Sequence, residues 1–230
     1  SAPAAAASGQ PWDWMVSPYI WAAGVSTDIE TRVPPTSVEV DTEFEDVIDK
    51  LDGAFEVHVE GRGDHVGVML DFTYLGLAGE KDRRFLRTET DLDTRLLDAA
   101  VTWAPGDKRG AGLDVIAGVR YIDADLTVDF DPYNPAIPTA SLDLGDGYTD
   151  LLVGARYTWP LSEKWSFTAR GDFSTGESEG TWSANLMAQY RTGNGAWIFG
   201  YRYLDISMDS FQGASDLMVS GVAVGYGFRF

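Results

Sequence analysis

Apolar and polar residues alternate with a period of two along most of this chain. Between positions 65 and 75, Val66, Val68 and Leu70 fall on one face of an extended segment, whereas Asp71 falls on the other. Because successive side chains of a β-strand point to opposite faces, this period predicts strands with one apolar and one polar face. The same alternation recurs in residues 54–61, 113–128, 165–174, 180–191 and 196–208.

The alternating segments suit a transmembrane barrel better than a soluble β-sandwich, in which the apolar faces would form the core. They run for ~10–14 residues, longer than the roughly five or six of an average soluble strand. Their connections alternate between short and long, as in outer-membrane barrels. Tryptophans gather near the segment ends, where such barrels carry interfacial girdles: Trp12, Trp14, Trp103, Trp159, Trp165 and Trp197.

The short connections set the expected number of strands. Four of them join eight strands, and a first and a last strand make ten: 61–64, 105–112, 160–164 and 191–195. The predicted fold class is all-β, an up-and-down antiparallel transmembrane barrel with both termini in the periplasm. Eight or twelve strands are the alternatives, because 25–53 and 123–141 are long enough to hide or lose a hairpin. The ten expected strands are 13–24, 54–61, 65–77, 89–104, 113–128, 142–159, 165–174, 180–191, 196–208 and 216–230.

Composition excludes several other classes of protein. The 230 residues include no Cys, so disulfides and thiolate metal sites are impossible. The formal net charge of −19 argues against nucleic-acid binding, which needs clustered Lys and Arg. No apolar run approaches the ~20 residues of a membrane-spanning helix. We expect residues 1–11 to be a flexible lead-in trimmed from a secreted precursor, and 12–230 to form a single barrel.

The C-terminal residues resemble the sorting signal by which outer-membrane barrels are recognised by the barrel-assembly machinery. Tyr226, Phe228 and the terminal Phe230 alternate on one face, and Gly225 also matches the signal, whereas Ala223 stands where a polar residue is commoner. This resemblance implies localisation in the outer membrane of a Gram-negative bacterium, with its lipids and lipopolysaccharide as surroundings.

The chain as a whole resembles a broad group of proteobacterial outer-membrane proteins that are loosely akin to OmpW and to the OmpA barrel. The segments that carry the resemblance are Ser-Pro-Tyr-Ile-Trp-Ala-Ala-Gly at 17–24, Phe-Glu-Asp-Val-Ile-Asp-Lys-Leu-Asp at 44–52 and Gly-Tyr-Arg-Tyr-Leu-Asp at 200–205. Most of this group has no assigned function. The likeness to OmpW-like barrels implies passage of small, often hydrophobic compounds.

A short repeat, Gly-x-Arg-Tyr, places arginines on the predicted inner face of three strands, at 118–121, 154–157 and 200–203. Counting along each strand gives the expected lumen bases as Arg120, Arg156, Arg170, Arg202 and Arg229, and the expected lumen acids as Glu56, Glu60, Asp71, Asp98, Asp114, Asp150 and Asp172. Unpaired charges in a narrow barrel are costly, so these residues should form an ion-pair network. Two interpretations are open: a selectivity ring or gate, and a structural plug.

His58 lies on the inner face between Glu56 and Glu60 and is the sharpest candidate for catalysis or metal binding. A nucleophilic site would need a Ser within reach of the imidazole, and Gly67 and Met69 occupy the neighbouring positions of the adjoining strand. Alternate residues on one strand are also a weak zinc signal. We therefore expect His58 to belong to the ion-pair network, with no catalytic residue, no resident metal and no cofactor.

The long connections are acidic, most of all 25–53 and 122–150, in which carboxylates far outnumber bases. Acidic outer loops beside phosphorylated lipopolysaccharide would need divalent cations to bridge like charges, and the alternative is a solvated surface. A short amphipathic helix that could act as a lid is indicated by the spacing of Phe44, Val47, Ile48 and Leu51.

Three functions are therefore open. The first and preferred one is a narrow porin-like channel or gated passage for small solutes, lined by the lumen charges. The alternative is a plugged barrel whose acidic loops bind lipopolysaccharide, divalent cations or a partner. The third is a lipid-modifying enzyme centred on His58, and we expect no enzymatic activity. The solute, the oligomeric state and the loop partners are not encoded in any recognisable pattern.

Overall fold

The computed structural model describes residues 11–32, 35–42, 51–83, 86–106, 110–134, 138–210 and 213–230. Within these ranges, no helix is long and apolar enough to cross a membrane. The regular elements are all strands: β1 (Asp13–Arg32), β2 (Pro35–Thr42), β3 (Leu51–Arg62), β4 (Val66–Arg83), β5 (Leu86–Trp103), β6 (Gly112–Pro132), β7 (Ala140–Pro160), β8 (Trp165–Gly176), β9 (Gly180–Arg191), β10 (Gly195–Ser210) and β11 (Gly213–Arg229).

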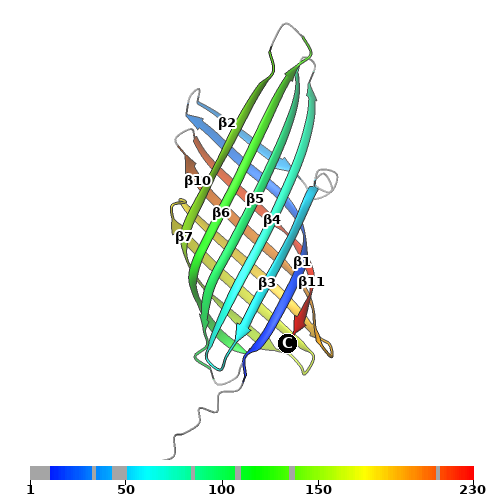
Figure 1. The fold of residues 1–230 in the computed structure, drawn as a ribbon, viewed down its shortest axis with the longest axis vertical. Coiled ribbons are helices and arrows are strands. Elements are labelled where there is room, and N and C mark those ends of the chain that lie inside the picture. Colours follow the sequence, from blue (N-terminus) through cyan, green and yellow to red (C-terminus); the bar gives the residue numbers. More distant parts are fainter. Residues whose placement is uncertain are drawn as a thin grey trace, which may run out of the picture.

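Ten of these strands form a closed antiparallel barrel (Figure 1), which confirms the predicted fold class and strand number. Each strand of the barrel pairs with the next one, with β1 pairing directly with β3, and β11 pairs with β1 to close the sheet. At the end of this seam, Trp14 N donates to Phe230 O (3.3 Å) and Phe230 N donates to Trp14 O (3.0 Å). Closure removes the free edges that an open sheet would expose to lipid.

The eleventh strand, β2, corrects the expectation that 25–53 is a loop. β1 is long: its first part, Asp13–Ile20, pairs with β3, and its second part, Val25–Arg32, pairs with β2. β2 therefore extends the sheet above β3 as a hairpin with β1 and does not add a crossing strand. Of the expected amphipathic helix, Leu51 begins β3 and the other three positions lie outside the described residues.

The two ends of the barrel differ. Both termini of the sheet and the four short turns lie at one end, the short-turn end, while β4–β7 rise far beyond the rest at the other, the long-loop end (Figure 1). Strand bounds at the short-turn end lie within two residues of those predicted. At the long-loop end most strands are longer than predicted: β6 runs to Pro132 and β7 starts at Ala140, so both ends of the segment 129–141, which was expected to be loop, are strand.

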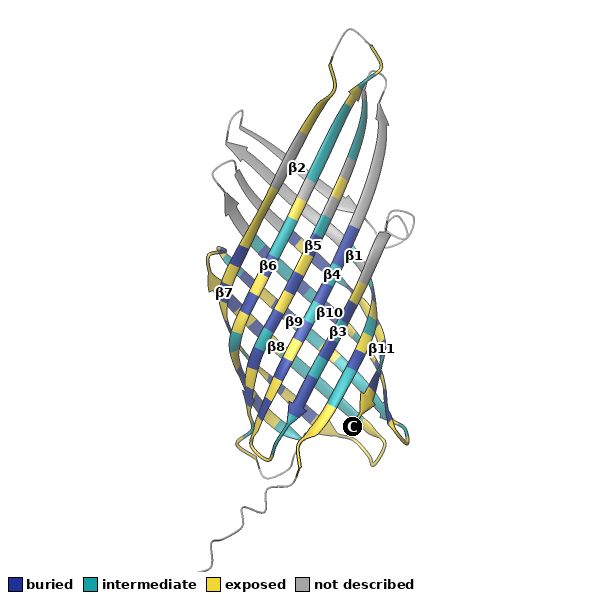
Figure 2. Cartoon of the chain, viewed as in Figure 1, coloured by how far each residue is buried: buried dark blue, intermediate teal, exposed yellow. Residues whose placement is uncertain are grey.

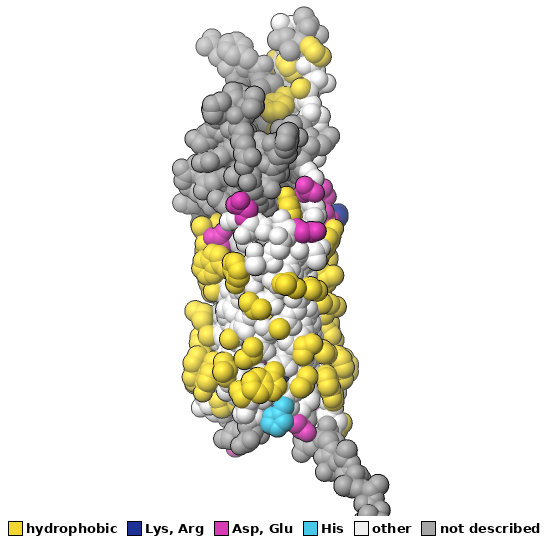
Figure 3. All heavy atoms as spheres, turned by 90° about the vertical axis from the view of Figure 1, so that its left-hand side faces the viewer, with side chains coloured by type: hydrophobic (Ala, Val, Ile, Leu, Met, Phe, Trp, Pro, Cys, Tyr) yellow, Lys and Arg dark blue, Asp and Glu magenta, His cyan; other side chains and the backbone are white. Residues whose placement is uncertain are grey.

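The outer surface of the barrel carries an apolar belt. Outward residues such as Ile20 (71% exposed) and Leu151 (70%) contrast with inward ones such as Ile116 (1%), and this alternation runs along each strand (Figure 2). Apolar side chains cover the wall, and acidic side chains lie above them (Figure 3). A soluble protein rarely exposes so large an apolar surface, so the belt is the lipid-facing surface.

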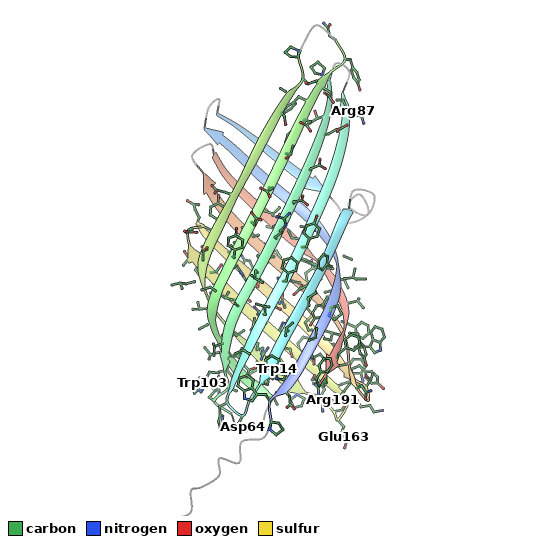
Figure 4. All side chains as sticks on the ribbon, in the orientation of Figure 1. Trp14, Asp64, Arg87, Trp103, Glu163 and Arg191 are labelled. Carbon is green, nitrogen blue, oxygen red and sulfur yellow. The ribbon has the colours of Figure 1, made fainter. Side chains whose placement is uncertain are left out.

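Aromatic side chains edge this belt towards the short-turn end, where Trp14 and Trp103 lie (Figure 4). Other aromatic rings at this end pack in pairs across neighbouring strands: Trp165 with Tyr190 (centroids 5.0 Å apart) and Trp197 with Tyr226 (5.2 Å). Trp and Tyr prefer the membrane–water interface because their rings have an apolar body and a polar tip. The sequence prediction of a girdle at the strand ends is consistent with this arrangement.

Phe199 tests whether the apolar belt faces lipid, because its side chain points outward from the part of β10 that lies in the belt and is 41% exposed. We expect Phe199→Arg to lower the free energy of unfolding by ~2–4 kcal/mol near mid-membrane, since a guanidinium is costly there. Folding titrations in lipid vesicles measure this loss, with Glu163→Arg in an exposed turn as the control. A neutral Phe199→Arg would mean that this residue does not face lipid.

Candidate functional site in the barrel lumen

A charged layer and an apolar layer lie next to each other in the lumen, and Met69, Ala100, Ile116 and Leu152 form a second, smaller buried apolar cluster. Charged side chains fill the central part of the lumen, and the apolar layer follows directly towards the long-loop end. On β5 the charged Asp98 is followed by Leu96, and on β6 Arg120 is followed by Ile122, each two positions further along the inner face. All four side chains are almost fully buried. The lumen is therefore filled with side chains, as expected of a narrow barrel.

Arg120 is the centre of the charged layer and is completely buried. Its Nε and Nη2 donate to the two carboxylate oxygens of Asp98, each at 2.7 Å, and Nη2 also donates to Asp172 Oδ1 at 2.7 Å. The planar guanidinium suits this bidentate geometry, which makes charge-assisted bonds strong and directional. Arg120 thereby ties β6 to β5 beside it and to β8 across the lumen.

Arg170 extends the layer from the same carboxylates. Its Nε donates to Asp172 Oδ2 (2.8 Å) and its Nη1 to Asp71 Oδ2 (2.9 Å), while Nη2 lies 3.6 Å from Asp98 Oδ2. Asp71 comes from β4, so this arginine spans the lumen from β8. Each of these carboxylates contacts more than one cation, which spreads the charge and offsets the cost of burial.

His58 and Glu60 continue the network towards the short-turn end. His58 Nδ1 hydrogen-bonds Asp71, and its Nε2 lies 3.3 Å from Glu60 Oε2. Glu60 also accepts from Arg62 Nε (2.8 Å) and from Arg156 Nη1 (3.1 Å). Arg156 in turn donates from Nε to Asp114 Oδ2 (2.6 Å).

Arg202 forms a separate pair at the border between the charged and apolar layers. It binds Glu56 through Nη1, which also donates to Thr73 Oγ1 at 3.1 Å. Its guanidinium carbon lies 5.0 Å from the ring centroid of Trp21, within the range of a cation–π interaction. Arg202 therefore connects the ion pairs to the apolar layer.

The charges in the lumen are nearly balanced. The paired carboxylates are Glu56, Glu60, Asp71, Asp98, Asp114 and Asp172, and their partners are Arg62, Arg120, Arg156, Arg170, Arg202 and, when protonated, His58. Asp150 is equally buried but is held by hydroxyl and backbone groups: it accepts from Ser178 N (3.0 Å) and from the Ser174 hydroxyl (3.3 Å). It thus fastens the β8–β9 connection to the wall.

Arg229 is where the predicted network is wrong. Its side chain is exposed at the short-turn end of β11, although strand alternation placed it in the lumen. The barrel ends one residue later, so the inner register there opens to solvent and a long arginine reaches water. Arg62 was not predicted to be part of the network, although its position two residues after Glu60 puts it on the same inner face.

The residues that resemble the assembly signal lie at the closing seam. Tyr226 packs against Phe228 (centroids 4.9 Å apart) and against Trp197, and Phe230 pairs through its backbone with Trp14. Phe230 is 80% exposed, so its ring is available to a partner.

On β4 the register partner of His58 is Asp71, rather than Gly67 or Met69 as predicted. A serine lies beside His58 on its other neighbour, β1, which the sequence prediction did not consider. Ser17 on β1 is the direct register partner of His58 and is completely buried. However, both ring nitrogens of His58 face carboxylates, those of Asp71 and Glu60. A catalytic base needs one nitrogen free to accept the nucleophile's proton, so this arrangement does not activate Ser17. In the described part of the chain, no group of three or more acidic, His or Cys side chains could hold a metal ion.

The apolar layer was not predicted. Trp21, Leu75, Leu96, Ile122, Tyr148, Leu204, Ile206, Leu217, Val219 and Ala223 form one buried cluster. The sequence indicates the apolar layer where the alternation stops. Leu96 and Leu97 are adjacent apolar residues on opposite faces of one strand, and so are Tyr203 and Leu204. A small cavity, with room for about one water-sized group, is lined by Trp21, Thr73, Leu75, Thr94, Leu96, Leu204, Ile206, Leu217 and Val219.

Comparison with known proteins identifies the fold. No protein-family model and no curated protein matches the chain. Among solved structures, the outer membrane protease OmpT from Escherichia coli has a TM-score of 0.52 at 10% identity, over 98% of this chain and 99% of that chain. Ail, the attachment invasion locus protein of Yersinia pestis, has a TM-score of 0.43 at 8% identity, over 95% and 100%. The outer membrane protein AlkL has a TM-score of 0.42 at 12% identity, over 100% and 95%. The likeness to OmpT, together with the exposed apolar belt, shows that the chain is an outer-membrane β-barrel protein.

Proposed function

We propose that this barrel is a gated passage that takes small apolar molecules into the long-loop half of its lumen, and that the charged layer keeps the lumen closed to ions. The observation that carries this proposal is the apolar layer itself. Barrels that conduct ions have a polar interior, whereas Trp21, Leu96 and Ile122 here are at most 2% exposed and face the lumen. The resemblance of 17–24 and 200–205 to OmpW-like barrels points to the same kind of solute.

The charged layer supports the closed state. An ion that crossed it would have to separate buried pairs such as Arg120–Asp98, and breaking a buried pair by removing a partner typically costs ~3–5 kcal/mol. The near balance of charges also leaves only a small excess of one sign to attract a counter-ion into the lumen. A passage through this layer would therefore need pairs to exchange partners, which makes the layer a gate that is closed at rest.

The proposal is tested by conductance and by ligand binding. In planar bilayers we expect small, intermittent conductance from the wild type, and a large steady conductance would contradict the closed gate. For binding, hexane is titrated into the protein in micelles while the methyl signals of inward Leu204, Ile206 and Leu217 are followed by NMR. We expect these signals to shift more than that of outward Leu151, which contacts detergent. Ile206→Trp should fill the cavity and abolish the difference.

The orientation of the barrel is part of the proposal. We place the short-turn end and both termini in the periplasm, because outer-membrane barrels have short periplasmic turns and long outer loops. A membrane-impermeant thiol reagent added to intact cells should then label Asn134→Cys, in the β6–β7 connection, but neither Glu163→Cys nor Asn194→Cys. Labelling of the latter two in intact cells, with none at position 134, would invert the model.

Surface interaction is the second candidate, favoured by the length of β6 and β7 beyond the belt. β6 carries Asp123, Asp125, Asp129 and Asp131 at alternate positions in this extension. Lipopolysaccharide binding bridged by divalent cations would fit these charges. If the barrel has this function, Ca²⁺ should promote binding of lipopolysaccharide vesicles to the purified protein. The double substitution Asp125→Asn with Asp129→Asn should weaken this binding. Binding unaffected by chelation would exclude the bridging role.

A further inference from the structure

The apolar cavity has two polar atoms in its lining that lack partners. Trp21 Nε1 and Thr94 Oγ1 are buried, in side chains exposed by 2% and 4%, and neither has a hydrogen-bond partner among the described residues. Both residues line the cavity, together with Thr73 and six aliphatic side chains. An unsatisfied buried donor or acceptor typically costs about 1–3 kcal/mol, so such atoms in one small cavity call for an explanation.

The chemistry of these atoms restricts what can satisfy them. An indole Nε1–H can only donate, so the group that completes Trp21 must be a hydrogen-bond acceptor. The Thr94 hydroxyl can donate to the same kind of group, and it can also accept. Thr73, by contrast, already accepts from Arg202. An acceptor oxygen would therefore satisfy both unpartnered atoms, and the aliphatic side chains of the cavity would surround it.

The charges next to the cavity favour a neutral oxygen. Arg202 lies over Trp21, but its charge is matched by Glu56, with which it forms a buried pair. An anion placed in the apolar layer would lack a counter-charge of its own, and burying an unpaired anion is costly. A neutral carbonyl or hydroxyl oxygen meets the demand of the two side chains without that cost.

We propose that the ligand of this cavity is a small neutral molecule with an aliphatic body and one hydrogen-bond-accepting oxygen, such as a ketone or an alcohol, and that Trp21 and Thr94 recognise the oxygen. This inference rests on the proposed function and specifies the class of molecule that the apolar layer takes. The aliphatic body packs against Leu75, Leu204 and Leu217, and the oxygen accepts from Trp21 Nε1. The cavity is narrow, so a ligand larger than water displaces part of its lining.

The experiment compares three probes of equal chain length on the full-length protein: hexane, 2-hexanone and hexanoate. Affinity is measured from the methyl shifts of Leu204 and Leu217, and hydrogen bonding from the indole N–H signal of Trp21, which Trp21→Phe assigns. We expect 2-hexanone to bind about tenfold more tightly than hexane, corrected for partition into detergent, since one buried donor gains its partner. Hexanoate should bind more weakly than the ketone, and only the ketone should shift the indole N–H signal.

Two variants separate recognition from general packing. Trp21→Phe and Thr94→Val should each reduce the preference for ketone over hexane while leaving hexane binding nearly unchanged. Thr102→Val is the matched control, because Thr102 is an equally buried lumen threonine (4% exposed) that does not line this cavity. If Trp21→Phe does not fold, Thr94→Val alone tests the prediction.

The outcomes distinguish this inference from the proposed function. Equal binding of hexane and 2-hexanone, both shifting the inward methyls, would overturn the inference and leave the proposed function standing. It would also mean that a resident water satisfies Trp21 and Thr94. Tighter binding of hexanoate than of 2-hexanone would show that the ligand is not a neutral molecule. No effect of any probe on the inward methyls would refute both.

Discussion

Arg120→Met is expected to lower the free energy of unfolding by ~3–5 kcal/mol, because two buried carboxylates lose a partner at once and are left to share Arg170. Asp98 and Asp172 both accept from this guanidinium, and all three side chains lie within the sealed lumen. Equilibrium unfolding in urea, with the protein inserted in lipid vesicles, measures the loss. The side chain of Met is similar in length, so lost charge pairing, rather than lost volume, dominates the effect.

Arg95→Met is the matched control. Arg95 makes an ion pair with Asp123 at 3.1 Å, but half of its side chain is exposed, and exposed pairs contribute only ~0–1 kcal/mol. Adding Asp98→Asn to Arg120→Met should recover part of the stability, since it removes one of the two carboxylates that would otherwise share Arg170. If Arg120→Met cost no more than Arg95→Met, the charged layer would not act as a buried network.

Loss of the terminal aromatic ring should have the second large effect, on assembly in the cell. We expect Phe230→Asp to reduce the amount of inserted protein to a small fraction of wild type, because the resemblance of residues 225–230 to the sorting signal implies that the exposed ring takes part in recognition. Phe230→Tyr, which keeps an aromatic ring, is the control and should assemble nearly normally. Quantitative immunoblots of purified outer membranes measure both.

Refolding in vitro separates recognition from stability. Purified Phe230→Asp should still fold into detergent micelles, because the bonds between Trp14 and Phe230 involve only backbone atoms. A variant that failed equally in cells and in micelles would show that the ring stabilises the barrel itself.

Much of the architecture could be predicted because lipid imposes a simple rule on the outer face. Where a strand crosses the membrane, every second residue must be apolar, and the short turns are marked by residues such as Pro160 and Gly195. Beyond the belt this rule ends. The outer positions of β6 there are acidic, as at Asp125 and Asp129, so a continuing strand looks like a loop.

The lumen could be predicted only in part, because its side chains contact one another rather than a uniform solvent. Alternation placed Arg120 and Asp98 correctly on inner positions, but it could not show which arginine reaches which carboxylate across the barrel. The prediction also assumed a polar interior, and it therefore missed the inward apolar residues Leu96 and Ile122. The neighbour of His58 on β1, Ser17, was missed because β1 and β3 are joined through a long connection that contains β2, so no tight turn fixes their register.

The seam between β1 and β11 has a consequence for the order of events in biogenesis. It joins the first strand of the sheet to the last, so the wall is incomplete until the final residues have left the ribosome and crossed the periplasm. Contacts between such distant segments carry a large loop-closure entropy and form slowly. In the meantime the chain has two unpaired edges and a bare apolar face, both of which promote aggregation. We therefore expect the barrel to be most open to aggregation and proteolysis for as long as the ring stays open, and any mutation that delays closure to lengthen that period.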